Sequence, residues 1–218
     1  MDIILKISQE LMCRQEQVAA AVKLIDEGCT IPFIARYRKE ATGSLNDEQL
    51  RTLDERLTYL RGLEDRKEKV IALIEKKGIL TDELKKSILA AETLVAVEDL
   101  YRPYKPKRKT RATIAQSKGL TGLANIISLQ MTNKPISEEA LAYVSEEKEV
   151  HSAEEAIAGA MDIIAESISD NAEYRTEIRS LTMDKGILMT TAKDPEAESV
   201  YEMYYDFNEG LSKLAGHR

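Results

Sequence analysis

The sequence predicts an all-α protein, and three observations lead to that fold class. Hydrophobic residues make up 43% of the 218-residue chain, which is typical of a folded rather than a disordered protein. The chain contains only two Phe and no Trp, so its core must be built mainly from Leu, Ile, Val and Ala. These residues recur at intervals of three and four, the period of an amphipathic helix. We therefore expect a multi-helix bundle, arranged as one large domain or two small ones.

The first helical pattern covers residues 3–27 and predicts one amphipathic helix or two short ones, ended by Gly28. Pro32 suits the first turn of the next helix, because the nitrogen of proline needs no hydrogen-bond partner at that position. This second helix continues through residues 33–40, and the glycine-containing sequence 42–44 ends it.

The longest predicted helix covers residues 46–77. Asn46 can cap the first backbone amides, and Gln49 can bond back to the amide of Asn46. Leucines at 50, 53, 57 and 60 then follow at helical spacing, with Gly62 as a possible kink. A helix of about 45 Å, at 1.5 Å per residue, is too long for its neighbours to cover in a small domain. We expect it to act as a spine helix.

Further helices are predicted at 81–91, from 114, from 123, from 137, and from 152 to 185. Residues 187–191 could instead be extended. Asp194 and Pro195 favour the start of a final helix, whose spacing would place the tyrosines and phenylalanine of 201–207 in the core.

Residues 101–111 form a basic segment that contains six cations and no acidic residue. Removing these charges would take the net charge of the chain from −7 to −13. Pro103 and Pro106 disfavour helix in the residues before them, so we expect an extended, partly polyproline-like connection. The tyrosine rings of this segment could pack on a neighbour or stack on a base.

Two interpretations of the basic segment stay open. Its cations could contact the phosphates of a nucleic acid, or they could be solvated and pair with acidic helices of the same molecule. The overall acidity favours the second interpretation. Three basic residues at 36–39 could extend a basic face, although charges on an amphipathic helix more often face solvent or form structural ion pairs. The candidate nucleic-acid-binding residues are Arg102, Lys105, Lys107, Arg108, Lys109, Arg111, Arg36, Arg38 and Lys39.

No residue pattern in the sequence indicates catalysis, a metal ion or a cofactor. Cys13 and Cys29 lack metal-ligand spacing, and His151 and His217 are isolated. No apolar run is long enough to span a membrane, and the start of the sequence lacks the basic residues of a signal peptide. We therefore expect a cytoplasmic protein that is not an enzyme, needs no cofactor and does not bind a membrane.

Four strings of residues resemble the Tex family of bacterial transcription accessory proteins. They are 30–43 (TIPFIARYRKEATG), 98–108 (EDLYRPYKPKR), 110–115 (TRATIA) and 159–166 (GAMDIIAE). The resemblance implies a helical N-terminal region with a helix-turn-helix-like part. In the family, this region precedes an RNase H-like (YqgF) domain, helix-hairpin-helix elements and a C-terminal OB-fold that binds RNA. It also implies a relationship to a eukaryotic elongation factor that chaperones histones.

From the residues and the resemblance together we expect three parts: a helical part at 1–100, the basic connection at 101–111, and a second helical part at 112–218 that stops before the RNase H-like domain. The expected function is a non-catalytic helical scaffold of a transcription accessory factor, contributing a secondary surface for RNA or DNA. The main nucleic-acid contacts would come from the absent C-terminal domains. The alternative is a protein-interaction scaffold that docks on the transcription or translation machinery, or on those domains.

Overall fold

The computed structural model describes residues 2–216, and it is 63% helical, so the predicted all-α class is confirmed. The chain folds into two compact units, Met1–Glu98 and Asp99–Arg218. His217, one of the two isolated histidines, lies outside the described residues. Within residues 2–216, no helix combines the length and the apolar composition needed to cross a membrane.

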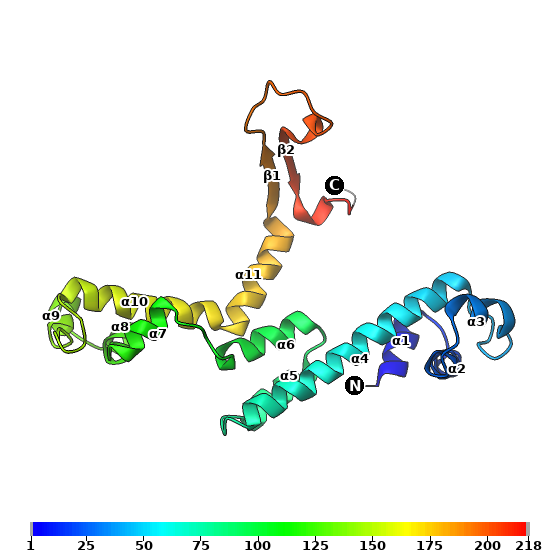
Figure 1. The fold of residues 1–218 in the computed structure, drawn as a ribbon, viewed down its shortest axis with the longest axis horizontal. Coiled ribbons are helices and arrows are strands. Elements are labelled where there is room, and N and C mark those ends of the chain that lie inside the picture. Colours follow the sequence, from blue (N-terminus) through cyan, green and yellow to red (C-terminus); the bar gives the residue numbers. More distant parts are fainter. Residues whose placement is uncertain (1, 217–218) are drawn as a thin grey trace. The chain divides into compact units, whose positions relative to one another are not determined.

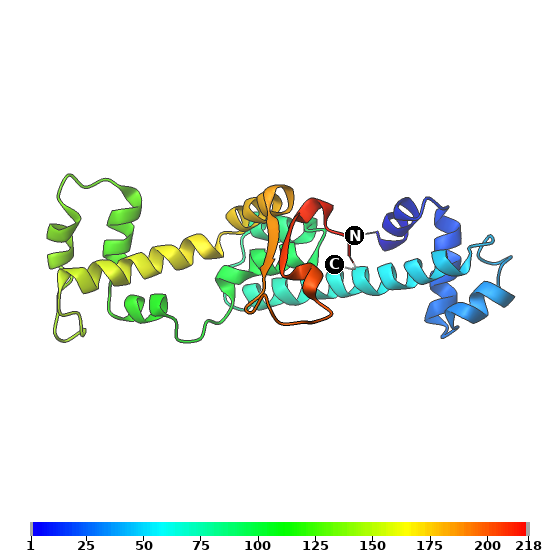
Figure 2. The same cartoon turned by 90° about the horizontal axis from the view of Figure 1, so that it is seen from above.

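The first unit is built on one long helix, α4 (Figure 1). Its helices are α1 (Ile3–Glu10), α2 (Gln15–Asp26), α3 (Ile31–Tyr37), α4 (Asp47–Glu75) and α5 (Asp82–Ala90), followed by the start of α6 (Leu94–Tyr101). The helices α1, α2 and α3 pack on the N-terminal part of α4, and α5 packs near its C-terminal end (Figures 1 and 2). The pattern at 3–27 therefore forms two short helices, one of the two arrangements that it predicted.

The helix α4 has the capping and the buried face that the sequence predicts. Asn46 Oδ1 accepts a hydrogen bond from the Gln49 amide at 2.8 Å, and Gln49 Oε1 accepts one from the Asn46 amide at 3.0 Å. The helix runs without a break through Gly62. One face is buried, formed by Leu50, Leu53, Leu57, Leu60, Leu63, Val70 and Ile74.

Lys67 also lies on the buried face of α4, with a side chain that is only 1% exposed. Its ammonium group donates a 2.9 Å hydrogen bond to the carbonyl oxygen of Leu89, near the C-terminal end of α5. Glu64, one turn earlier, lies 2.8 Å from the same ammonium. The buried charge is therefore paired, and it provides a partner for a carbonyl at a helix end.

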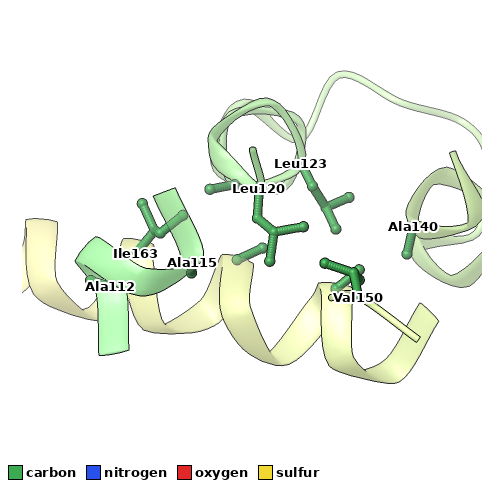
Figure 3. Packing of buried hydrophobic residues seen from close by; sticks show 10 residues of the cluster. Ala112, Ala115, Leu120, Leu123, Ala140, Val150 and Ile163 are labelled. Atoms are coloured by element: carbon green, nitrogen blue, oxygen red, sulfur yellow. The ribbon is translucent and has the colours of Figure 1, made fainter. Parts of the chain in front are cut away.

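The second unit contains a core on the helix α10 (Ala153–Asp170). The helices α7 (Arg111–Ser117), α8 (Thr121–Leu129) and α9 (Ile136–Leu141) pack on it. Figure 3 shows Ala115 and Leu120 beside α10. Gly159 permits this approach, because a Cβ atom there would lie 2.4 Å from Leu120 Cδ1.

A buried carboxylate holds the helix α11 (Ala172–Lys185), which has no buried residue of its own. Asp99, near the C-terminal end of α6, accepts a 2.6 Å hydrogen bond from Arg175 Nε and a further bond from Arg179. The Asp99 side chain is buried, and both arginines come from α11. These ion pairs, rather than an apolar face, fix the start of this helix.

The predicted final helix from residue 194 is wrong. This region contains only a short 3-10 turn, Glu202–Tyr204, before the strand β2 (Asp206–Gly210). The strand β2 pairs antiparallel with β1 (Ile187–Thr191), with Ile187 opposite Gly210 and Thr191 opposite Asp206. Residues 206–210 pair with β1 instead of continuing a helix, and Phe207, the one aromatic residue of this strand, suits an extended backbone. A last 3-10 turn covers Leu211–Lys213.

The core interpretation of the tyrosine cluster is also wrong for Tyr201, which is 66% exposed. Tyr204 and Phe207 are partly buried, and their rings are in edge contact with centres 5.5 Å apart.

Candidate nucleic-acid interface

The nine candidate residues fall into two groups. Six belong to the basic segment, residues 101–111, in the second unit, and three lie in and directly after α3 in the first unit. We expected the basic segment to be extended, but only part of it lacks helical structure. Its first part, Arg102–Tyr104, forms a 3-10 turn, because the fixed φ angle of Pro103 is compatible with a first helical turn. Residues 105–110 have no regular secondary structure.

Asp170 fixes the basic segment to the C-terminal end of α10. Arg102 Nε donates a 2.9 Å hydrogen bond to Asp170 Oδ1, and Lys107 donates to Asp170 Oδ2. Lys107 also lies 2.9 Å from Glu166 Oε2, one turn earlier on α10. A carboxylate at the C-terminal end of a helix is unfavourable by itself, because that end is partly negative. The two cations offset this effect.

The pKa values of these groups follow from burial and pairing. Burial raises the pKa of Asp170, but the hydrogen bonds from Lys107 and Arg102 outweigh burial, so the pKa lies below its ordinary value. Burial lowers the pKa of Lys107, but its bonds to Asp170 and Glu166 outweigh burial and raise the pKa. Asp170 and Lys107 therefore both stay charged near neutral pH and form an ion pair with each other.

The remaining cations of the basic segment have different surroundings. Lys105 Nζ lies 5.5 Å from the centre of the buried Tyr101 ring, in a cation–π contact. Arg108, Lys109 and Arg111 are exposed, and within residues 2–216 they form no ion pair. Arg111 begins α7, where Thr110 caps the helix by accepting a hydrogen bond from the Thr113 amide at 3.1 Å.

A hollow of about 370 Å³ lies between the basic segment and α10. Its lining includes Lys105, Lys107 and Arg108 on one side and the carboxylates of Glu166 and Asp170 on the other. Because the lining carries both signs of charge, the hollow is not an anion pocket. Lys109 and Arg111 are not among the residues that line the hollow.

The second group lies on and after α3. Arg36, Arg38 and Lys39 are exposed, and the guanidinium carbon of Arg38 lies 5.3 Å from the centre of the Phe33 ring. On the opposite side, Ile34 is fully buried in the first unit. Arg36 therefore lies on the exposed side of a helix that is anchored by an apolar residue, and Arg38 and Lys39 directly follow that helix.

Sequence reasoning missed four residues of these two surfaces. Glu166 ends the quoted string 159–166 and Asp170 lies in no quoted string. Neither could be linked to the basic segment, because acidic residues are frequent along the chain and the partners are 59 or more positions away. Phe33 and Tyr37 sit in the quoted string 30–43, but the sequence does not reveal that their rings are accessible to solvent.

Within residues 2–216, no group of three or more His, Cys, Asp or Glu side chains is arranged to hold a metal ion. His151 lies just before α10, where its backbone amide donates a 2.7 Å hydrogen bond to Glu155. The fold and the two basic groups thus define a helical scaffold with two exposed basic surfaces.

Comparisons with known proteins assign this scaffold to a family. Residues 1–75 match the model of the Tex-like protein N-terminal domain, and residues 131–218 match that of the Tex central region. The chain belongs to the Tex family.

Three relatives illustrate this membership. The chain is 46% identical over 216 residues to the uncharacterized protein YdcI of Bacillus subtilis, covering 98% of this chain and 30% of that protein. It is 42% identical over 221 residues to the transcriptional accessory protein Tex of Neisseria gonorrhoeae, covering 100% and 29%. It is 28% identical over 193 residues to the S1 RNA-binding domain-containing protein 1 of Pongo abelii, covering 88% and 19%. The chain therefore spans less than a third of the length of each relative.

Proposed function

We propose that this chain is the non-catalytic helical scaffold of a cytoplasmic transcription accessory factor, and that it contributes a secondary nucleic-acid-binding surface through Arg108, Lys109 and Arg111. One observation carries the proposal: these three cations are exposed and form no ion pair with any residue of the described part of the chain, on a segment that the bonds at Asp170 fix to α10. The names of the Neisseria and Pongo relatives, which refer to transcription and to RNA binding, support the general function.

Five of the six cations of the basic segment divide into two roles in this proposal. Arg102 and Lys107 fasten the segment to α10, so their charges are largely neutralised. Arg108, Lys109 and Arg111 can approach phosphates within a span of four residues. A fixed position reduces the entropy that the segment loses when it binds. The contact is expected to be weak and sensitive to salt, because the rest of the chain is acidic.

We also propose that α2 and α3 form the helix-turn-helix-like part. They are joined by residues 27–30, a turn that contains Gly28 with φ +84°. Short turns with a glycine are typical of helix-turn-helix units.

The test of the binding surface is a triple variant, Arg108→Gln, Lys109→Gln and Arg111→Gln. RNA and DNA binding would be measured at a series of salt concentrations. We expect weaker binding, with a salt dependence smaller by about 0.7 per lost single-strand contact or about 0.9 per lost duplex contact.

The matched control is Lys85→Gln, Lys86→Gln and Lys134→Gln, which removes the same charge from exposed lysines elsewhere. If the two triple variants bind with the same affinity and the same salt dependence, the basic segment is not a binding surface.

A second candidate function is a docking surface for protein, supported by the side chains of α11 and β1. Large apolar residues are exposed there, among them Ile178, Leu181, Ile187 and Met189. The relatives contain additional polypeptide that could cover such a surface. The test adds the remaining part of the Neisseria relative in trans and measures hydrogen exchange at α11. Protection that Ile178→Lys abolishes and Leu129→Lys retains supports docking, and no protection contradicts it.

A further inference from the structure

Two aromatic side chains of α3, Phe33 and Tyr37, are accessible to solvent. Phe33 and Tyr37 are one helical turn apart, and their ring centres are separated by 5.4 Å with an angle of 46° between the planes. Phe33 is 37% exposed and Tyr37 is 62% exposed. Both rings therefore offer accessible aromatic surface, and Tyr37 offers more of it than Phe33.

Positive charge surrounds these rings. Residues 31–39 contain three cations, Arg36, Arg38 and Lys39, and no acidic residue. The Arg38 guanidinium already lies against the Phe33 ring, while Tyr37 is the more open of the two rings. Exposed rings among cations are the combination that binds unpaired bases together with their phosphates.

The loop that carries Arg38 and Lys39 has a fixed backbone. Thr42 is fully buried, and its hydroxyl donates hydrogen bonds to the carbonyl oxygens of Arg38 and Lys39 at 3.2 and 3.3 Å. Gln17, on α2, donates a 2.7 Å hydrogen bond to the carbonyl oxygen of Gly43. Gly43 has φ +58°, a conformation that suits glycine. The backbone positions of Arg38 and Lys39 are therefore fixed directly after α3 before any ligand binds.

We infer that Phe33 and Tyr37 form a base-stacking platform for single-stranded nucleic acid, with Arg36, Arg38 and Lys39 contacting the adjacent phosphates. This inference rests on the proposed function and adds a second surface, in the first unit, for one form of nucleic acid. A duplex keeps the faces of its bases stacked inside, so it can use the cations but not the rings. Stacking does not involve the sugar, so RNA and DNA single strands are expected to respond alike.

The test uses the full 218-residue chain with Tyr37→Leu and Phe33→Leu, alone and together. The probes are oligouridylate, oligothymidylate and a mixed-sequence duplex of about 12 nucleotides or base pairs, a length within the range that such sites cover. Leucine keeps the apolar bulk and the net charge but removes the aromatic face. We expect the double variant to bind both single strands about tenfold more weakly, with unchanged duplex affinity and unchanged salt dependence. Tyr37→Trp should bind single strands at least as tightly as the original chain.

The matched control is Tyr201→Leu, which changes an equally exposed tyrosine in the second unit. Circular dichroism and thermal unfolding would verify that the variants remain folded. Single-strand affinity that is unchanged in the double leucine variant overturns the platform, and so does an equal loss for duplex and single strands. The proposed function is tested separately by the variant of 108–111: if that variant alone weakens binding, the platform fails while the proposed function stands.

Discussion

The Asp170 carboxylate accepts a 2.9 Å hydrogen bond from Arg102, and this bond fastens the start of the basic segment to the end of α10. Lys107 donates to the other oxygen of the same carboxylate. The sequence predicts only a charged connection here. In the structure, one acidic side chain bonds to two cations of this segment, Arg102 and Lys107, and holds it against α10. Its charges divide into those that hold the segment and those that face solvent.

Removal of this carboxylate is expected to weaken folding but strengthen nucleic-acid binding. Asp170→Asn should lower the free energy of unfolding by about 1–2 kcal/mol, since the charged hydrogen bonds are lost while the partly exposed cations regain water. The same change releases Arg102 and Lys107 toward phosphates, so affinity for single strands should rise and its salt dependence should become steeper. Denaturant unfolding and salt titrations measure the two effects. The control, Asp162→Asn, removes the same charge from α10 at a site with no ion pair in the described part of the chain. Equal behaviour of the two variants would contradict the role given to Asp170.

The contribution of Asp170 to stability should depend on pH. Its pKa in the folded protein lies below the value of about 3.9 in the unfolded chain. The carboxylate therefore stabilises the fold fully above that unfolded value, and the contribution is lost as the pH falls through the folded pKa. The difference in unfolding free energy between the original chain and Asp170→Asn should be constant from about pH 6 to 8 and shrink below about pH 4. A difference that grows as the pH falls would show that the pKa is raised instead.

Replacing two different glycines by alanine should change the free energy of unfolding in opposite directions. Gly159→Ala should lower the free energy of unfolding by about 1–3 kcal/mol, because the new methyl group would collide with Leu120 in the core. Gly62→Ala should raise it by about 0.5–1 kcal/mol, since no atom lies within 4 Å of a Cβ there and the position is inside a continuous helix. Denaturant unfolding of the two variants tests the packing on α10 and the continuity of α4 at Gly62. Stabilisation by Gly159→Ala would mean that α8 packs on α10 less closely than described.

The position of α11 should depend on Asp99. Asp99→Asn removes the charge that holds Arg175 and Arg179, and we expect a loss of about 1–3 kcal/mol in the local stability of α11. Hydrogen exchange of the α11 amides measures this directly. Asp184→Asn, an exposed change on the same helix, should leave that exchange unchanged. Equal protection in both variants would show that other contacts hold α11.

Local signals explain why most of the fold could be predicted. The reciprocal bonds of Asn46 and Gln49 and the regular leucines of α4 involve residues close together in the sequence, so their pattern indicates the helix directly. The strand β2 could not be found in this way. The aromatic residues of 201–207 are spaced as in a helix, and the strand structure depends on the pairing of 206–210 with 187–191.

The candidate site was predictable to a similar extent. The six cations of the basic segment are evident in the sequence, but the bond between Arg102 and Asp170 joins residues 68 positions apart. The sequence therefore shows that charge is concentrated there, and the fold decides which cations are neutralised. The exposure of Phe33 and Tyr37 also depends on the tertiary structure, since it is decided by which side of α3 packs on α2 and α4.

The buried ammonium group of Lys67 can be used to detect opening of the contact between α4 and α5. An acylating reagent in the surrounding water can reach Lys69, whose side chain is 63% exposed, but it cannot reach Lys67 while α5 stays in place. The ratio of labelling at Lys67 to labelling at Lys69, measured by mass spectrometry on a single peptide, would report the opening of the contact between α4 and α5.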